Sequence, residues 1–221
     1  TLVSSILSQL EINLAGTIFR QWIIKNRMDT VKIDSILSSL GPQLSLSIKT
    51  LLQYPTNAIG SVMNPTPFYV NQNLTVGDIL SILKKDKNRY CRYVYIVNEN
   101  LSLRGVVRFK DIFYADETSI GSSIMCSDIV VFHPEDSIRK SFTDPCWKKW
   151  TTMPVVNHQN NLIGLIRFET LEAQILSQGK KSLNQDNEVQ QAGNAISEVF
   201  QIGLNATVTS LMLPLQGYKK S

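Results

Sequence analysis

Cysteine and histidine are scarce in this chain of 221 residues, which has three cysteines and two histidines. No C-x-x-C pair occurs and the number of cysteines is odd, so we expect no disulfide framework, and the pattern suits a reducing compartment. His133 and His158 lie near no cysteine or serine in a nucleophile motif. The chain also has no glycine-rich phosphate loop and no H-E-x-x-H sequence. These absences lead us to predict that the protein is not an enzyme.

An uninterrupted apolar stretch is also missing. A membrane-spanning helix needs about 20 mostly apolar residues, and the most apolar C-terminal segment, 193–216, is broken by Glu198, Gln201 and Asn205. We expect an amphipathic helix there that packs on another domain or subunit, with a membrane-surface or membrane-entry segment as the alternative. No signal peptide is visible, and because the chain begins with threonine we expect it to be part of a longer polypeptide.

A strong excess of charge of one sign is absent as well. The 22 basic and 18 acidic residues leave a net charge of +4, and the densest basic stretch, residues 84–89, is short. Proteins that bind nucleic acids usually gather lysine and arginine on one face. We therefore expect no nucleic-acid partner.

Apolar residues at helical spacing fill the N-terminal quarter of the chain. Asp29-Thr30 offers a helix start and Gly41-Pro42 a stop followed by a new start, before Tyr54-Pro55 ends the pattern. We predict a helical domain over residues 1–56, with its apolar stripes packed in a core. These stripes contain Ile6, Leu7, Leu10, Leu14, Ile18, Phe19, Trp22, Ile23, Val31, Ile33, Ile36, Leu37, Leu40, Leu44, Ile48, Leu51 and Leu52.

An internal repeat follows, which is the most informative feature of the sequence. Ser61-Val62-Met63 returns 62 positions later as Ser123-Ile124-Met125, and the stretch 103–109 returns 59 positions later as 162–168. One difference of three residues in a loop accounts for the change of offset. The repeat predicts two copies of one fold, over residues 57–121 and 122–176.

Each copy shows the pattern of a βαββα unit. The predicted strands are 68–70, 93–97 and 104–107 in the first copy and 129–132, 153–156 and 162–166 in the second. Thr75 and Asp136-Ser137 are predicted helix caps, before helices at 76–83 and from Ile138 onward, and a final helix starts at Phe109 or Phe168. Two such units would pack sheet against sheet about a pseudo-twofold axis, with Trp147 and Trp150 in the packing of the second copy.

The polar stretch 177–192 has the composition of a linker. The fold class that we predict is therefore α+β, consisting of a helical subdomain, two βαββα repeats and a C-terminal amphipathic helix. The last of these would lie within residues 193–221.

The repeats resemble tandem CBS domains, and the order of the parts resembles the cytosolic region of MgtE-type magnesium transporters. The junction Tyr54-Pro55-Thr56-Asn57-Ala58-Ile59-Gly60-Ser61-Val62-Met63-Asn64-Pro65 is similar to the family's passage from a helical superhelix to the first CBS domain. Ile59 is inserted into the usual Ala-Gly pair. The resemblance covers about residues 30–176.

This resemblance implies a regulatory, non-catalytic region on the cytoplasmic side of the cell membrane. It implies a homodimer formed through the CBS domains and a transmembrane pore domain in the same or a partner chain. It also implies that Mg²⁺ bound between domains controls the pore. The candidate Mg²⁺ ligands are the acids near the ends of the two repeats, Asp111, Asp116, Glu117, Glu169 and Glu172, although Thr170 stands where an acid is common in the family.

CBS pairs also bind adenine nucleotides through a Gly-h-h-Ser/Thr-x-x-Asp sequence, which gives the alternative function. The first copy keeps Gly105 and Asp111 but has Arg108 at the hydroxyl position, and the second has Arg167 there and loses the aspartate. The alternative is thus a stand-alone module that binds a nucleotide or other anion through Arg108, Asp111 and Arg167. Each arginine could instead be exposed or paired with a nearby acid such as Asp111 or Glu169, and a purely structural dimerisation module is the third possibility.

Overall fold

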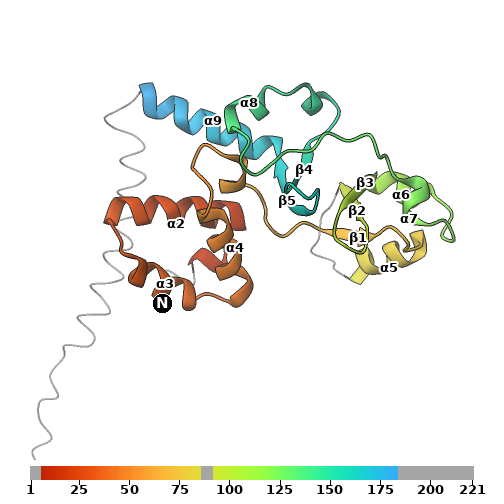
Figure 1. Cartoon of the computed structure of the whole chain (residues 1–221), viewed down its shortest axis with the longest axis horizontal. Coiled ribbons are helices and arrows are strands. Elements are labelled where there is room, and N and C mark those ends of the chain that lie inside the picture. The colour runs from red at the N-terminus through yellow and green to blue at the C-terminus, as the bar shows by residue number, and fades with distance from the viewer. Residues whose placement is uncertain (1–5, 86–91, 184–221) are drawn as a thin grey trace, which may run out of the picture.

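The computed structural model describes residues 6–85 and 92–183, in which the N-terminal helices are followed by the two repeats (Figure 1). The helical domain contains α2 (Ile12–Asn26), α3 (Thr30–Ser38) and α4 (Pro42–Leu52). Asp29 caps α3 by accepting a hydrogen bond from the backbone N–H of Lys32 at 2.8 Å. Proline at the first position of α4 begins that helix without a lost hydrogen bond.

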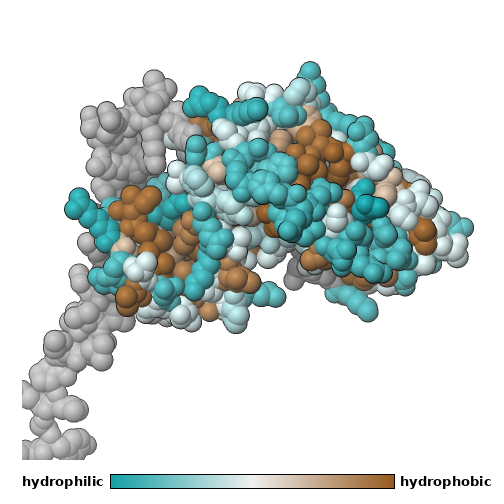
Figure 2. All heavy atoms as spheres, viewed as in Figure 1, coloured by the Kyte–Doolittle hydropathy of each residue, from teal (hydrophilic) through white to brown (hydrophobic). Residues whose placement is uncertain are grey.

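The core of the helical domain confirms part of the predicted stripes. Its buried members are Leu7, Ala15, Phe19, Leu37, Leu40 and Ile48. The prediction was wrong for Leu14 and Val31, which are 48% and 76% exposed. Apolar side chains therefore gather on the visible surface of the helical domain (Figure 2). The helical period selects a face of each helix, but the neighbouring helices that the structure describes do not cover every apolar position on that face.

The first repeat forms a three-stranded sheet in the order β1-β2-β3. β1 (Tyr69–Asn71) is parallel to β2 (Tyr93–Val97), which is antiparallel to β3 (Leu103–Arg108). The predicted helix is α5 (Val76–Lys85), and α6 (Phe109–Tyr114) starts at the predicted residue. Thr75 caps α5 as predicted, because its hydroxyl accepts from the N–H of Asp78 while the Asp78 carboxylate accepts from the N–H of Thr75.

The second repeat has α8 (Ile138–Phe142), the 3-10 turn η2 (Pro145–Lys148), the antiparallel pair β4 (Thr152–Val156) and β5 (Leu162–Arg167), and α9 (Phe168–Leu183). The predicted strand over 129–132 is wrong: only Phe132 pairs, through a parallel bridge to Val155. Pro134 cannot donate to a ladder, so it prevents the strand from continuing.

The predicted cap of the second repeat is also wrong in its detail. Ser137 stands at the N-cap of α8 but makes no capping hydrogen bond. The carboxylate of Asp136 instead accepts from the N–H of His133 at 2.7 Å and closes the turn that precedes the helix. The imidazole rings of His133 and His158 are stacked, with centroids 5.7 Å apart.

The two repeats exchange their first segments. η1 (Ile59–Ser61) and the residues after it pack on the second repeat, where Asn64 bridges to Leu165. α7 (Gly121–Ile124) and the residues after it pack on the first repeat, where Cys126 bridges to Val106. The boundaries 57–121 and 122–176 thus stay a prediction. Each repeat as defined by the sequence packs its first segment on the other repeat.

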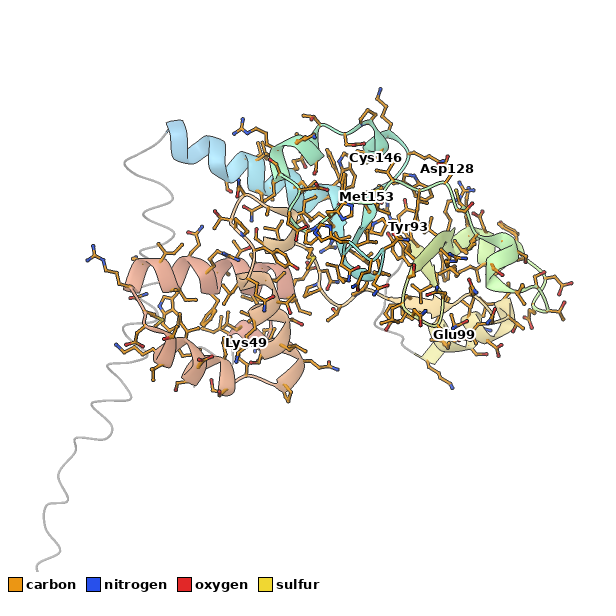
Figure 3. All side chains as sticks on the ribbon, viewed as in Figure 1. Lys49, Tyr93, Glu99, Asp128, Cys146 and Met153 are labelled. Carbon is orange, nitrogen blue, oxygen red and sulfur yellow. The ribbon has the colours of Figure 1, made fainter. Side chains whose placement is uncertain are left out.

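The sheets of the two repeats meet in one apolar core, as the pseudo-twofold arrangement predicts. Tyr95 is buried there and its hydroxyl donates to the carbonyl of Thr152 at 3.2 Å. Tyr93 packs edge-on against Trp150 with ring centroids 5.4 Å apart, and Tyr93 and Met153 mark the meeting of the sheets (Figure 3). Trp147 contacts the rings of Phe132 and Phe168, so both tryptophans serve packing.

α9 continues to Leu183, so the beginning of the stretch predicted as a linker, 177–192, is helical. The rest of that stretch and the C-terminal helix predicted within 193–221 lie outside the described residues. Among residues 6–85 and 92–183, no helix has the length and apolar character needed to cross a membrane.

Candidate regulatory site

The helical domain rests on the second repeat through a small apolar contact. Leu51 at the end of α4 is buried in the core cluster of the repeats, and Ile12 at the start of α2 packs against that cluster. The ring of Tyr54 lies on Gly60, where a Cβ atom would approach the ring carbons to 2.4 Å. Glycine is thus required at position 60, where the tyrosine ring leaves no room for a side chain.

One ion pair joins the same two parts of the molecule. Nη2 of Arg167, at the end of β5, contacts Oε2 of Glu11, which precedes α2. Both side chains are more than half exposed, at 51% for Arg167 and 64% for Glu11. The arginine that we predicted as an anion-binding residue therefore binds a carboxylate of the helical domain, and its partner is Glu11 rather than Glu169.

Arg108, the equivalent arginine of the first repeat, is paired differently. Its Nε donates to Oδ2 of Asp111 at 2.6 Å, within the turn that starts α6. The hydrogen bond to Asp111, followed by the attraction of that charge, raises the pKa of Arg108. The structure thus confirms, for Arg108, the predicted alternative that the arginine pairs with a nearby acid.

The five candidate Mg²⁺ ligands do not come together in the described part of the chain. Asp111 holds Arg108, and Asp116 accepts from the backbone N–H and the hydroxyl of Thr118, which lower its pKa. Glu117 lies over Gly77, and Glu169 and Glu172 are exposed on α9. No group of three or more His, Cys, Asp or Glu side chains in residues 6–85 and 92–183 could hold a metal ion. The residues present do not fit a closed metal centre.

Comparison with known families identifies a CBS domain in the first copy. The family model for the CBS domain matches residues 59–117, which cover the first copy. The magnesium transporter MgtE of Thermus thermophilus is 24% identical over 135 residues, which are 59% of this chain and 29% of that protein. The MgtE of Bacillus subtilis is 22% identical over 140 residues, which are 61% of this chain and 30% of that protein.

The chain resembles the cytosolic region of MgtE-type magnesium transporters. It spans about three tenths of the length of the two relatives above. Two solved structures share the fold of the MgtE-like chain. The cytosolic domain of the Mg²⁺ channel MgtE in complex with ATP has a TM-score of 0.70 at 20% identity and covers 77% of this chain and 68% of its own. The soluble part of a magnesium transporter has a TM-score of 0.64 at 20% identity, covering 80% and 72%.

These findings confirm the predicted resemblance and the α+β fold with its helical domain and CBS pair. The sequence reasoning missed Glu11 and the docking role of Tyr54. Glu11 stands 156 positions from its partner, and no local pattern signals such a pair. Gly60, which follows the Tyr-Pro junction, is the feature of the sequence that indicates a close contact there.

Proposed function

We propose that this MgtE-like chain is the regulatory region of a magnesium transporter, without catalytic activity of its own. The approach of the helical domain to the CBS pair would set the state of a transmembrane pore domain in the same or a partner chain. The region would then lie in the cytoplasm, at the inner face of the cell membrane. The observation that carries the proposal is the small contact of Leu51, Tyr54 and Glu11 with the second repeat. A contact between two domains can open and close as they move about a hinge.

We further propose that Mg²⁺ is the regulator, as the names of the relatives suggest. Mg²⁺ keeps several of its waters and is often held by only one or two carboxylates. A weak site of that kind would use one or two of the five acids and needs no three-ligand cluster. The candidates are Asp111, Asp116, Glu117, Glu169 and Glu172.

Thermal unfolding with and without millimolar Mg²⁺ tests this proposal. A ligand that binds only the folded state stabilises it, by about 2.7 kcal/mol at a hundred times its dissociation constant. We expect Mg²⁺ to raise the midpoint in the wild type and in the control Asp34→Asn, which removes an exposed acid of the helical domain. We expect a smaller rise in Asp116→Asn or Asp111→Asn. An unchanged midpoint in the wild type would contradict the proposal.

A second candidate is regulation by an adenine nucleotide or another anion. One structure of the same fold was solved with ATP, and Arg108 and Asp111 are partly exposed at the end of β3. ATP and AMP in the same unfolding experiment would raise the midpoint in the wild type and less in Arg108→Ala. If neither Mg²⁺ nor nucleotide had an effect, a structural dimerisation module would remain.

The homodimer is proposed to form through α6. Phe113 and Tyr114 are 71% and 85% exposed on this helix and pack edge-on, with centroids 5.8 Å apart. Exposed aromatic pairs are typical of protein interfaces. Light scattering should give a dimer for the wild type and a monomer for Phe113→Ser/Tyr114→Ser, and a monomeric wild type would contradict this arrangement.

A further inference from the structure

The matching arginines of the two CBS repeats have different partners, and the repeats differ at the position three residues after each arginine. Arg108 and Arg167 are equivalent at the offset of 59, and each ends the last strand of its repeat. At the same offset Asp111 is equivalent to Thr170. The first repeat therefore has an aspartate three residues after its arginine, where the second repeat has a threonine.

The structure shows the consequence of this difference. Arg108 is held by Asp111 inside the first repeat, at 2.6 Å. Arg167 has an uncharged threonine at the equivalent place and binds Glu11 of the helical domain. The first repeat thus has an intradomain ion pair, and the second has an interdomain one.

We propose that Arg167 and Glu11 form a built-in latch that holds the helical domain on the second repeat without a metal ion. The guanidinium supplies the positive charge that neutralises the acid at this contact, and no metal-binding cluster is found among the described residues. The latch would regulate a pore only if the proposed function holds. The latch itself is a property of this chain that can be tested in the presence of a chelator.

The ion pair adds to an apolar contact between the same two parts. Leu51, Ile12 and the Tyr54 ring provide that contact, and the pair shifts the balance between the docked and undocked states by its own energy. An exposed ion pair is worth up to about 1 kcal/mol, which changes a two-state equilibrium by up to about fivefold. Because both side chains are exposed, salt screens the pair and should weaken the latch.

Energy transfer between two dyes on the full chain measures docking directly. Dyes attached through non-natural residues at positions 49 and 99 report from α4 and from the turn between β2 and β3 (Figure 3). Every variant carries the same pair, and EDTA is present throughout. Replacing Lys49 removes only an exposed pair with Asp34 inside the helical domain.

Charge reversal tests the latch, and the double variant tests that the two charges act on each other. We expect Glu11→Arg to lower the docked-to-undocked ratio about fivefold or more, and Glu11→Arg/Arg167→Glu to return it to near the wild-type value. Unchanged energy transfer in Glu11→Arg, or no recovery in the double variant, would overturn the latch. The unfolding midpoint of each variant should stay near that of the wild type, because the pair is exposed.

Thr170→Asp tests the asymmetry of the repeats, with Thr170→Asn as the uncharged control of the same shape. The new carboxylate restores the pattern of the first repeat and should draw Arg167 away from Glu11, lowering the docked ratio by about two- to fivefold. The asparagine variant should stay near the wild type. Equal behaviour of the two variants would overturn the role of position 170. A missing response to Mg²⁺ would concern the proposed function alone, since none of these measurements contains Mg²⁺.

Discussion

Leu101 and Asn160 occupy equivalent positions in the two hairpin turns, and both have a left-handed backbone, with φ of 61° and 60°. In each turn an asparagine side chain, Asn98 or Asn157, accepts from the backbone N–H groups two and four residues on. Asparagine tolerates the left-handed conformation, whereas leucine is strained there. Asn160 also donates to the carbonyl of Leu103 at 3.2 Å.

Leu101→Asn should therefore stabilise the protein. It relieves the strain and, by the pseudo-twofold relation, places an amide near the carbonyl of Leu162. We expect the free energy of unfolding in urea to rise by about 1 kcal/mol. The reciprocal change, Asn160→Leu, should lower it by at least as much. A lower free energy of unfolding in Leu101→Asn would contradict this prediction and show that packing of the leucine side chain outweighs the backbone strain.

At this scale the sequence identified the arginines but only one of their partners. Asp111 lies three residues after Arg108 at a helix start, and such spacing brings two side chains together. Glu11 and Arg167 meet only because the helical domain docks on the second repeat. Their pairing could not be predicted before the arrangement of the domains was known.

The elements depend on close approach at two equivalent glycines. A Cβ atom at Gly105 would lie 2.8 Å from the carbonyl oxygen of Cys126, and one at Gly164 would lie 2.6 Å from the sulfur of Met63. These are the places where the exchanged segments cross β3 and β5. The Met-bearing turn of each repeat therefore packs on the glycine strand of the other.

Alanine at either glycine should weaken the exchange. We expect Gly105→Ala and Gly164→Ala each to lower the free energy of unfolding by about 1–3 kcal/mol, because the core is overpacked. Gly77→Ala is the control, since its Cβ would make ordinary contacts of 3.4 Å or more and alanine favours the helix. If all three variants unfolded at the same urea concentration, the exchanged packing would be wrong.

Most elements could be predicted because their signals are local. β2 has the predicted bounds, and α6 and α9 begin at the predicted residues. The predicted strand at 129–132 does not form, because Phe132 makes a single bridge to Val155 and Pro134 cannot donate the next hydrogen bond. The exchange of segments was missed because hydrogen bonds such as those of Asn64 with Leu165 join residues that are far apart in the sequence.

For the whole molecule, the order of helical domain and CBS pair could be predicted, but the way they touch could not. The junction at Tyr54 and Gly60 fixes where the chain passes between them. The acids proposed as Mg²⁺ ligands lie near the ends of the repeats in the sequence, but the fold leaves them apart. A regulatory site of few ligands has no pattern that composition or periodicity could reveal.

The most direct test of the central proposal is energy transfer between positions 49 and 99 during a titration with Mg²⁺. The Glu11→Arg variant begins from a lower docked fraction, so that closure can be seen if Mg²⁺ favours it. We predict that millimolar Mg²⁺ raises the docked fraction of both the variant and the wild type, while NaCl of equal ionic strength does not. A docked fraction that stays constant in both proteins would contradict regulation by Mg²⁺-linked closure.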